Sequence, residues 1–214
     1  LGLDENKASP IPIGIDPRVV ELYKKNYKNI RKELNISKND FVIIAVNQIA
    51  PDKGVDDIIN SFALIKNEIK NAKLIIVGSG KLESMMNDLI NKHNLKRDVT
   101  HLKNLSEQDL YNCYFSSDLL VNAQSQQNWS MSVQEAMACG LPIVSFDNIV
   151  LVKNNKNGII VKNRTPEGIK AGILKVYNGD INKMKEMSLI LTNNYTWENI
   201  AKEAIKKYKE LLEK

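Results

Sequence analysis

Short runs of β-branched and other apolar residues alternate along this chain with longer segments of helical periodicity. The clearest runs are residues 41–46, 74–77, 118–122 and 142–146, and shorter candidates are residues 99–102 and 159–161. Runs as apolar as these indicate strands that are covered on both faces, and their alternation with helices is typical of a parallel sheet. We therefore predict an α/β fold, a Rossmann-like doubly wound parallel sheet of about six strands with helices on both faces.

The segments between these runs carry the signals of amphipathic helices. Apolar residues recur at spacings of three and four over residues 55–69 and again over residues 82–90. Thr165 followed by Pro166 is an N-cap with a proline in the first turn, which predicts the start of a third helix. Thr196 is expected to cap a final helix.

Composition limits the class of protein and its partners. With 43% hydrophobic and 26% charged residues among 214, the chain has the balance of a soluble globular protein. Its net charge of +5 is compatible with a phosphate-bearing ligand, an anionic membrane surface or nucleic acid. The lysine-rich segments 24–32 and 202–214 are interpreted as the solvated faces of two surface helices.

The cysteines and the hydropathy pattern bear on location. No apolar run approaches the roughly 18 residues that a membrane-spanning helix needs. Cys113 and Cys139 form no CxxC pattern and are expected to be buried thiols in a reducing compartment. We expect a cytoplasmic protein with no nucleic-acid partner, and leave open a peripheral contact at the inner face of the membrane.

Three loops that follow predicted strands are candidates for a binding site, because doubly wound sheets bind ligands beyond the carboxyl ends of their strands. The first loop brings Lys53 and Gly54 to the start of a helix, an arrangement that suits a phosphate. The alternative is a lysine that is merely solvated. The second loop, Gly78-Ser79-Gly80, would let a ligand approach the backbone, although a tight strand-to-helix turn also requires glycine.

The third loop, residues 123–132, is polar and leads into a short helix that Gly140 and Pro142 end. Glu135 stands there among small and apolar residues, so its carboxylate needs a partner, for which a ligand hydroxyl is one candidate. The sequence has no Asp-x-Asp motif, and His93 and His101 lack the spacing of metal ligands. We therefore expect neither a metal nor a cofactor.

The string EAMACGLPIV at residues 135–144 strongly resembles the EAMACGLPVV segment of family 4 glycosyltransferases. Further segments resemble that family in order along the chain: IPIGID at 11–16, KGVD at 53–56, IVGSG at 76–80, NGIIV at 157–161 and YTWE at 195–198. The resemblance covers about residues 11–213. It implies the C-terminal lobe of the GT-B fold, with a nucleotide diphosphate sugar (a UDP-, GDP- or ADP-sugar) as ligand.

The same resemblance implies a division of the chain. Residues 1–16 would be the crossing segment between two lobes, residues 17–195 the donor-binding domain, and residues 196–214 a helix that packs back toward an N-terminal lobe. That other lobe would bind the acceptor, which is a glycan, a lipid-linked sugar or a protein.

Roles for individual residues follow from the resemblance. Lys53 should meet the diphosphate, Glu135 should accept hydrogen bonds from ribose hydroxyls, and the glycine loop should lie near the nucleoside. The amides around Ser130 and Ser132 should face phosphate or sugar. The expected donor-binding residues are Gln48, Lys53, Gly78, Ser79, Gly80, Ser125, Gln127, Ser130, Met131, Ser132 and Glu135, of which Lys53 and Gln127 are also the expected catalytic residues.

Four positions depart from the family pattern. Gln48 replaces an arginine, Gln127 an acid, Ser130 a glycine and Ile13 an asparagine. The first hypothesis is the donor-binding lobe of a retaining, metal-independent transferase, in which the leaving phosphate helps to deprotonate the acceptor. The alternative is a catalytically degenerate lobe that acts as a binding or regulatory partner. A sugar-nucleotide epimerase is a third possibility, which the EAMACG segment disfavours.

Overall fold

The computed structural model describes residues 11–125, 129–147 and 149–212. Six parallel strands form one sheet in the order β3-β2-β1-β4-β5-β6, which confirms the predicted doubly wound α/β fold. The strands are β1 (Phe41–Val46), β2 (Ala72–Val77), β3 (Val99–Leu102), β4 (Leu119–Asn122), β5 (Ile143–Phe146) and β6 (Gly158–Val161).

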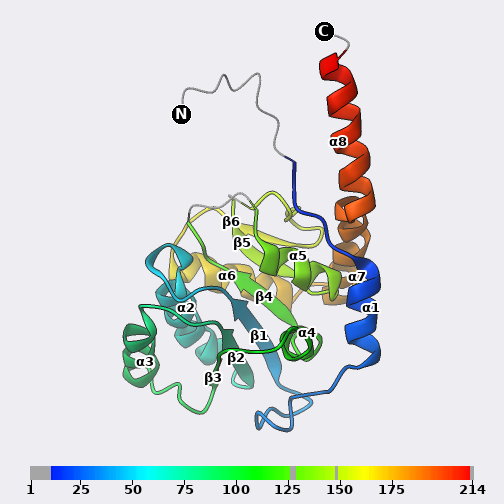
Figure 1. Cartoon of the computed structure of the whole chain (residues 1–214). Helices are drawn as coiled ribbons and strands as arrows, with labels where there is room; N and C mark the ends of the chain where they lie inside the picture. Colours follow the sequence, from blue (N-terminus) through cyan, green and yellow to red (C-terminus); the bar gives the residue numbers. More distant parts are fainter. Residues whose placement is uncertain (1–10, 126–128, 148, 213–214) are drawn as a thin grey trace.

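Helices cover both faces of this sheet. They are α1 (Pro17–Lys25), α2 (Val55–Glu68), α3 (Glu83–Lys92), α4 (Glu107–Phe115), α5 (Met131–Ala138), α6 (Pro166–Tyr177), α7 (Ile181–Thr192) and α8 (Trp197–Leu212), with short 3₁₀ turns η2 (Pro51–Lys53) and η3 (Asn193–Tyr195). Figure 1 shows α2 and α3 on the left of the sheet and α1 and α7 on the right.

Two hydrophobic cores lie on opposite faces of the sheet. Phe41, Ile43 and Ala45 of β1 join the core that contains apolar side chains of α2, α3 and α6. Val42 and Ile44 point to the other face and join the core under α1, α4 and α5. This alternation explains the unbroken apolar run of β1, since both of its faces are buried.

Two predicted helix starts are confirmed. The Thr165 hydroxyl accepts a hydrogen bond from the Gly168 amide at 3.2 Å and caps α6. The Thr196 hydroxyl accepts from the Asn199 amide at 3.3 Å at the start of α8. In both cases a side-chain oxygen satisfies one of the amides that have no partner within a helix.

The interpretation of residues 24–32 as one helical face was wrong. α1 ends at Lys25, and the following residues form turns. Arg31 organises these turns, because its guanidinium donates to the carbonyl oxygens of Asp40 and Ser116 at 2.9 and 2.8 Å and to the Asp118 carboxylate at 2.8 Å. The charge-assisted hydrogen bonds of Arg31 therefore stabilise a non-helical segment, although its lysines have helical spacing.

The segment before α1 and the segment that leads into α8 meet beside α5. The Ile15 amide donates to the Tyr195 carbonyl oxygen at 2.9 Å, and the Trp197 amide donates to the Ile15 carbonyl oxygen at 3.2 Å. A side chain at Gly14 would overlap the Trp197 ring. From this junction α8 runs away from the sheet, and Figure 1 shows it extending beyond the other helices. In the described chain, no helix combines the length and hydropathy required to span a bilayer.

Candidate functional site

The carboxyl ends of β1 and β4 mark the place where the strand order reverses. From β1 the chain enters α2 on one face of the sheet, and from β4 it enters α5 on the other face. The two helices therefore leave on opposite faces at this point, which is where doubly wound sheets bind ligands. The sequence-predicted site residues lie around this edge.

The loop after β1 and the glycine loop after β2 pack directly against each other. The Ile49 amide donates to the Ser79 carbonyl oxygen at 3.0 Å. A Cβ at Gly78 would overlap the Asn47 carbonyl oxygen, and one at Gly80 would overlap the carbonyl oxygen of Ile49. Both glycines are thus required by the packing of protein backbone, which is the structural alternative that the sequence left open.

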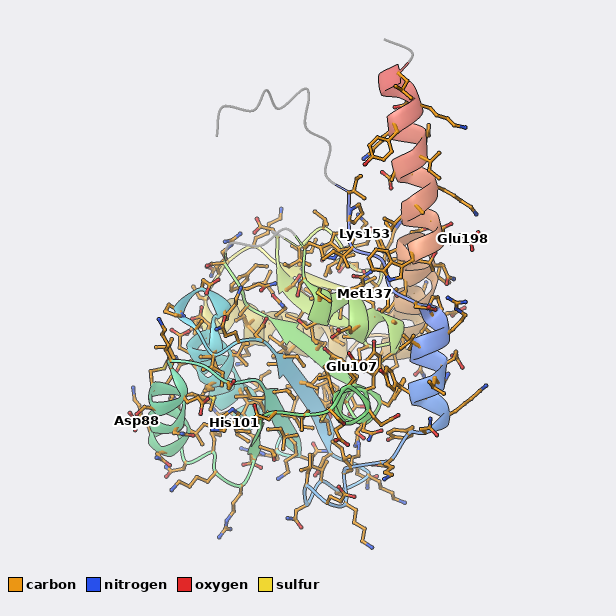
Figure 2. All side chains as sticks on the ribbon, in the orientation of Figure 1. Asp88, His101, Glu107, Met137, Lys153 and Glu198 are labelled. Carbon is orange, nitrogen blue, oxygen red and sulfur yellow. The ribbon has the colours of Figure 1, made fainter. Side chains whose placement is uncertain are left out.

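Side chains of β3 and α3 contact the backbone of the glycine loop through polar atoms. The Nε2 atom of His101 lies 2.8 Å from the Gly78 carbonyl oxygen, and Figure 2 labels His101 near β2 and β3. The Glu83 carboxylate accepts from the Gly80 amide at 3.0 Å and from Lys103 at 2.7 Å. The hydrogen bond from Lys103 lowers the pKa of Glu83, so this carboxylate stays ionised. His101 is the third residue of β3.

Lys53 lies in η2, where its side chain is only 19% exposed and its Nζ is 3.0 Å from Asp52 Oδ2. The hydrogen bond from Lys53 lowers the pKa of Asp52. Gly54 follows with φ 65° and is the N-cap of α2, as the sequence predicted. Gln48, in the same loop, is exposed. A ligand anion at Lys53 would therefore join an existing ion pair.

The loops after β1 and β4 are hydrogen bonded to each other at this edge of the sheet. The Ser125 amide donates to the Asp52 carbonyl oxygen at 3.0 Å. Arg164, which follows β6, donates to the Ser125 carbonyl oxygen at 3.1 Å and to Asp147 Oδ1 at 2.8 Å, and lies 5.4 Å from the centre of the Phe146 ring. Sequence reasoning missed Arg164, because its contacts join loops far apart in the chain.

Asn47 was also missed. Its Nδ2 atom is buried at the carboxyl end of β1 and has no hydrogen-bond partner among the described residues. A buried amide in this state is a donor that a bound group can satisfy.

The first turn of α5 has no side-chain cap from Ser130. Ser130 is the N-cap, but no hydrogen bond runs from its side chain to the first turn of the described helix. Its hydroxyl instead accepts from Asn122 Nδ2 at 3.2 Å and lies 3.1 Å from the Ser132 hydroxyl. Met131, the first residue of the helix, is 54% exposed. The N-terminal amides and the helix dipole together favour a negative charge here.

Glu135 lies one turn further along α5, on the side of α4. Tyr114 Oη donates to Glu135 Oε2 at 2.9 Å. Burial raises the pKa of Glu135, and the hydrogen bond from Tyr114 opposes this. The sequence analysis correctly predicted that this acid needs a partner. The partner in the structure is Tyr114 of the protein, not a ligand hydroxyl.

Glu135 also lines a cavity of about 270 Å³ between α5 and the crossing segment. The other lining residues are Ile13, Gly14, Ile15, Asp16, Val19, Tyr111, Met131, Gln134 and Trp197. Thus the structure brings Gln48, Lys53, Ser125 and the glycine loop together. Glu135 instead lines a separate cavity, between α5 and the crossing segment. Gln127 lies outside the described residues.

A search of residues 11–125, 129–147 and 149–212 finds no group of three or more His, Cys, Asp or Glu side chains arranged to hold a metal ion. Both cysteines carry free thiols. Burial raises the pKa of Cys113 to about 12, so this thiol is neutral.

Residues 26–194 match the family model for glycosyl transferases group 1. The chain belongs to this family. An uncharacterised glycosyltransferase of Methanocaldococcus jannaschii is 28% identical over 98% of the chain and 55% of the relative. The chain spans about half the length of the curated relatives it matches.

Solved structures share the fold of this group 1 glycosyltransferase chain. Anabaena HepE, solved in complex with UDP-glucose, superposes with a TM-score of 0.80 at 18% identity, covering 98% of this chain and 59% of HepE. The C-terminal domain of a Francisella tularensis group 1 protein, LpcC, has a TM-score of 0.71 at 14% identity, with 86% of this chain and all (100%) of that domain covered. The fold is therefore that of a C-terminal glycosyltransferase lobe.

Proposed function

We propose that this chain is the donor-binding lobe of a retaining glycosyltransferase, which transfers a sugar from a nucleotide diphosphate sugar to an acceptor. The observation that carries the proposal is the N-terminus of α5, whose first-turn amides receive no side-chain cap from Ser130 and which lies at the sheet edge that also carries Lys53. Helix N-terminal amides and a lysine at the same sheet edge suit a diphosphate.

The proposed chemistry uses these groups on the leaving phosphate. Breaking the bond between sugar and diphosphate builds negative charge on the phosphate oxygens, and fixed donors stabilise that charge without having to reorganise. Lys53 and the α5 amides would supply them. The departing phosphate would accept the proton of the acceptor hydroxyl as the new glycosidic bond forms on the same face of the sugar. No metal ion takes part in this scheme.

The donor is proposed to be a UDP-sugar first, with GDP- and ADP-sugars as the next choices, since HepE was solved with UDP-glucose. The acceptor, which is a glycan, a lipid-linked sugar or a protein, would bind mainly to a second lobe, to which α8 would also pack. Cys113 and Cys139, both free, support a cytoplasmic location. Contact with the inner face of the membrane remains part of the proposal for lipid-linked acceptors.

Calorimetric titration with UDP, GDP, ADP and bare pyrophosphate tests the proposal. We expect one nucleoside diphosphate to bind, weakly, and more tightly than pyrophosphate, and we expect no transfer to an added acceptor by this chain alone. Absence of binding by all three nucleotides would contradict the donor-lobe function. Robust transfer by the isolated chain would contradict the requirement for a second lobe.

A degenerate lobe that serves as a binding or regulatory partner is the second candidate. One observation favours it: Gln48 is exposed beside Lys53 at a position where the family resemblance calls for an arginine. A degenerate lobe would bind nucleotide without hydrolysing or transferring any nucleotide sugar. Assay of the intact protein with a panel of nucleotide sugars separates the two candidates.

A further inference from the structure

A buried tyrosine holds the Glu135 carboxylate from the side of α4. Tyr114 is 0% exposed, and its hydroxyl donates to Glu135 Oε2 at 2.9 Å. Within the described part of the chain, this hydroxyl is the single side-chain donor to Glu135. The second carboxylate oxygen, Oε1, therefore keeps its capacity to accept hydrogen bonds.

We propose that Tyr114 is a positioning residue, which holds Glu135 in the conformation that receives the ribose hydroxyls of a bound nucleotide. This inference rests on the proposed function, because it takes Glu135 as a ribose contact. It adds a residue that does not touch the ligand itself.

The packing around Tyr114 makes it suitable for this role. Its ring packs edge-on against Tyr111 with 5.9 Å between ring centroids and an interplanar angle of 79°. It belongs to the same hydrophobic core as Val133, Ala136 and Met137 of α5. Figure 2 labels Met137 on α5 and Glu107 on α4, the two helices that this contact joins. A ring fixed in this way holds its hydroxyl at one point, so Glu135 loses little rotamer freedom when a ligand binds.

Tyr114 also controls the charge of Glu135. Burial and the neighbouring Glu107 raise the pKa of Glu135, whereas the hydrogen bond from Tyr114 lowers it. The other titratable groups around it are Tyr111 and Tyr114 on α4, Cys139 at the C-cap of α5 and Asp16 of the crossing segment, which lines the same cavity. Tyr114 remains a neutral donor, because burial keeps its pKa well above the ordinary value. Loss of its hydroxyl should therefore raise the pKa of Glu135.

The test compares Tyr114→Phe, Glu135→Gln and the double variant by calorimetry with UDP and with pyrophosphate, from mildly acidic to neutral pH. If another base binds better to the wild type, GDP or ADP replaces UDP. We expect Tyr114→Phe to lower nucleotide affinity about threefold to tenfold, the range of one hydrogen bond, and to leave pyrophosphate affinity unchanged. The decline of nucleotide affinity toward acid should begin at a higher pH than in the wild type.

The double variant separates positioning from general damage. In the Glu135→Gln background, Tyr114→Phe should produce no pH shift, because the residue that it positions no longer titrates. Tyr27→Phe is the matched control, since it removes another tyrosine hydroxyl, which lies 3.1 Å from Ser116 Oγ at the C-cap of α4. It should leave both the affinity and the pH profile unchanged.

Three results would overturn the inference. One is wild-type nucleotide binding by Tyr114→Phe at every pH, and another is an equal loss for pyrophosphate. The third is an undiminished pH shift in the Glu135→Gln background. Failure of the proposed function gives a different result, namely a folded wild-type chain that binds none of UDP, GDP and ADP, and it removes this inference as well. Thermal melting of each variant verifies that it is folded.

Discussion

Gly54 packs against the backbone of Ala123 so closely that a Cβ on Gly54 would overlap the Ala123 carbonyl oxygen. This contact joins the N-cap of α2 to the loop after β4, and Gly54 also has φ 65°. We predict that Gly54→Ala destabilises the fold by about 2–5 kcal/mol, the sum of the left-handed backbone penalty and the overpacking penalty. Urea unfolding measures the loss.

Gly140→Ala is the matched control for this variant. Gly140 also has a positive φ, 77°, but its nearest neighbour is Leu189 at 3.5 Å, an ordinary contact. It should cost only the backbone penalty of about 1–2 kcal/mol. Equal losses for the two variants would mean that the contact with Ala123 contributes nothing.

The second prediction concerns Lys53. Replacing it with alanine should lower affinity for a nucleoside diphosphate about tenfold to a hundredfold, because a charge-assisted contact to phosphate is lost. Lys73→Ala is the control, since Lys73 is similarly buried at 20% exposure and pairs with Asp98 at 2.9 Å at the opposite end of the sheet. Unchanged affinity in a folded Lys53→Ala variant would make Lys53 only a partner of Asp52.

The third prediction is a pH dependence of stability that arises from Glu135. Burial raises its pKa in the folded state, so folding is penalised above that pKa, where the buried group must be ionised. The penalty disappears as pH falls through the raised folded pKa toward the ordinary value. Glu135→Gln, which still accepts from Tyr114, should therefore be more stable than the wild type at neutral pH.

The stability difference between Glu135→Gln and the wild type should shrink toward acid, where both side chains are neutral. Urea unfolding over a pH series measures it. A variant less stable than the wild type at neutral pH would mean that the ionised carboxylate stabilises the fold, which is the opposite of the expected sign.

The strands were predictable because both faces of each are covered, which leaves an unbroken apolar run such as Phe41–Val46. Within α4, buried Asn112 accepts a hydrogen bond from the Lys28 amide at 3.0 Å, a tertiary contact that no sequence pattern reveals. The partner of Glu135 was missed for a related reason. Tyr114 lies 21 residues earlier, on α4, and a single tertiary hydrogen bond leaves no periodic signal. The placement of loops at one sheet edge was predictable, but the contacts of Arg164 and Asp52 across them were not.

The last prediction concerns Gln48 and Gln127, where this chain departs from its family. Gln48 is exposed, so an arginine there disturbs no core. If the lobe has decayed, Gln48→Arg with Gln127→Glu should restore nucleotide-sugar binding or hydrolysis, since Lys53, the glycine loop and Glu135 are in place. If the site is adapted to another donor, the same change should lower activity with that donor.

We expect the adapted site, because an amide both donates to and accepts from sugar hydroxyls, whereas a carboxylate only accepts. A missing cation at a catalytic phosphate typically costs on the order of 10²- to 10³-fold in rate, which slows a transferase without abolishing it. The double variant of the intact protein should therefore lose turnover of the donor that the wild type uses best, as measured by release of nucleoside diphosphate. Gln48→Arg alone serves as the control that separates the added charge from the change at Gln127. A wild-type protein that is inert toward every nucleotide sugar, together with a gain of binding in the double variant, would favour the degenerate lobe instead.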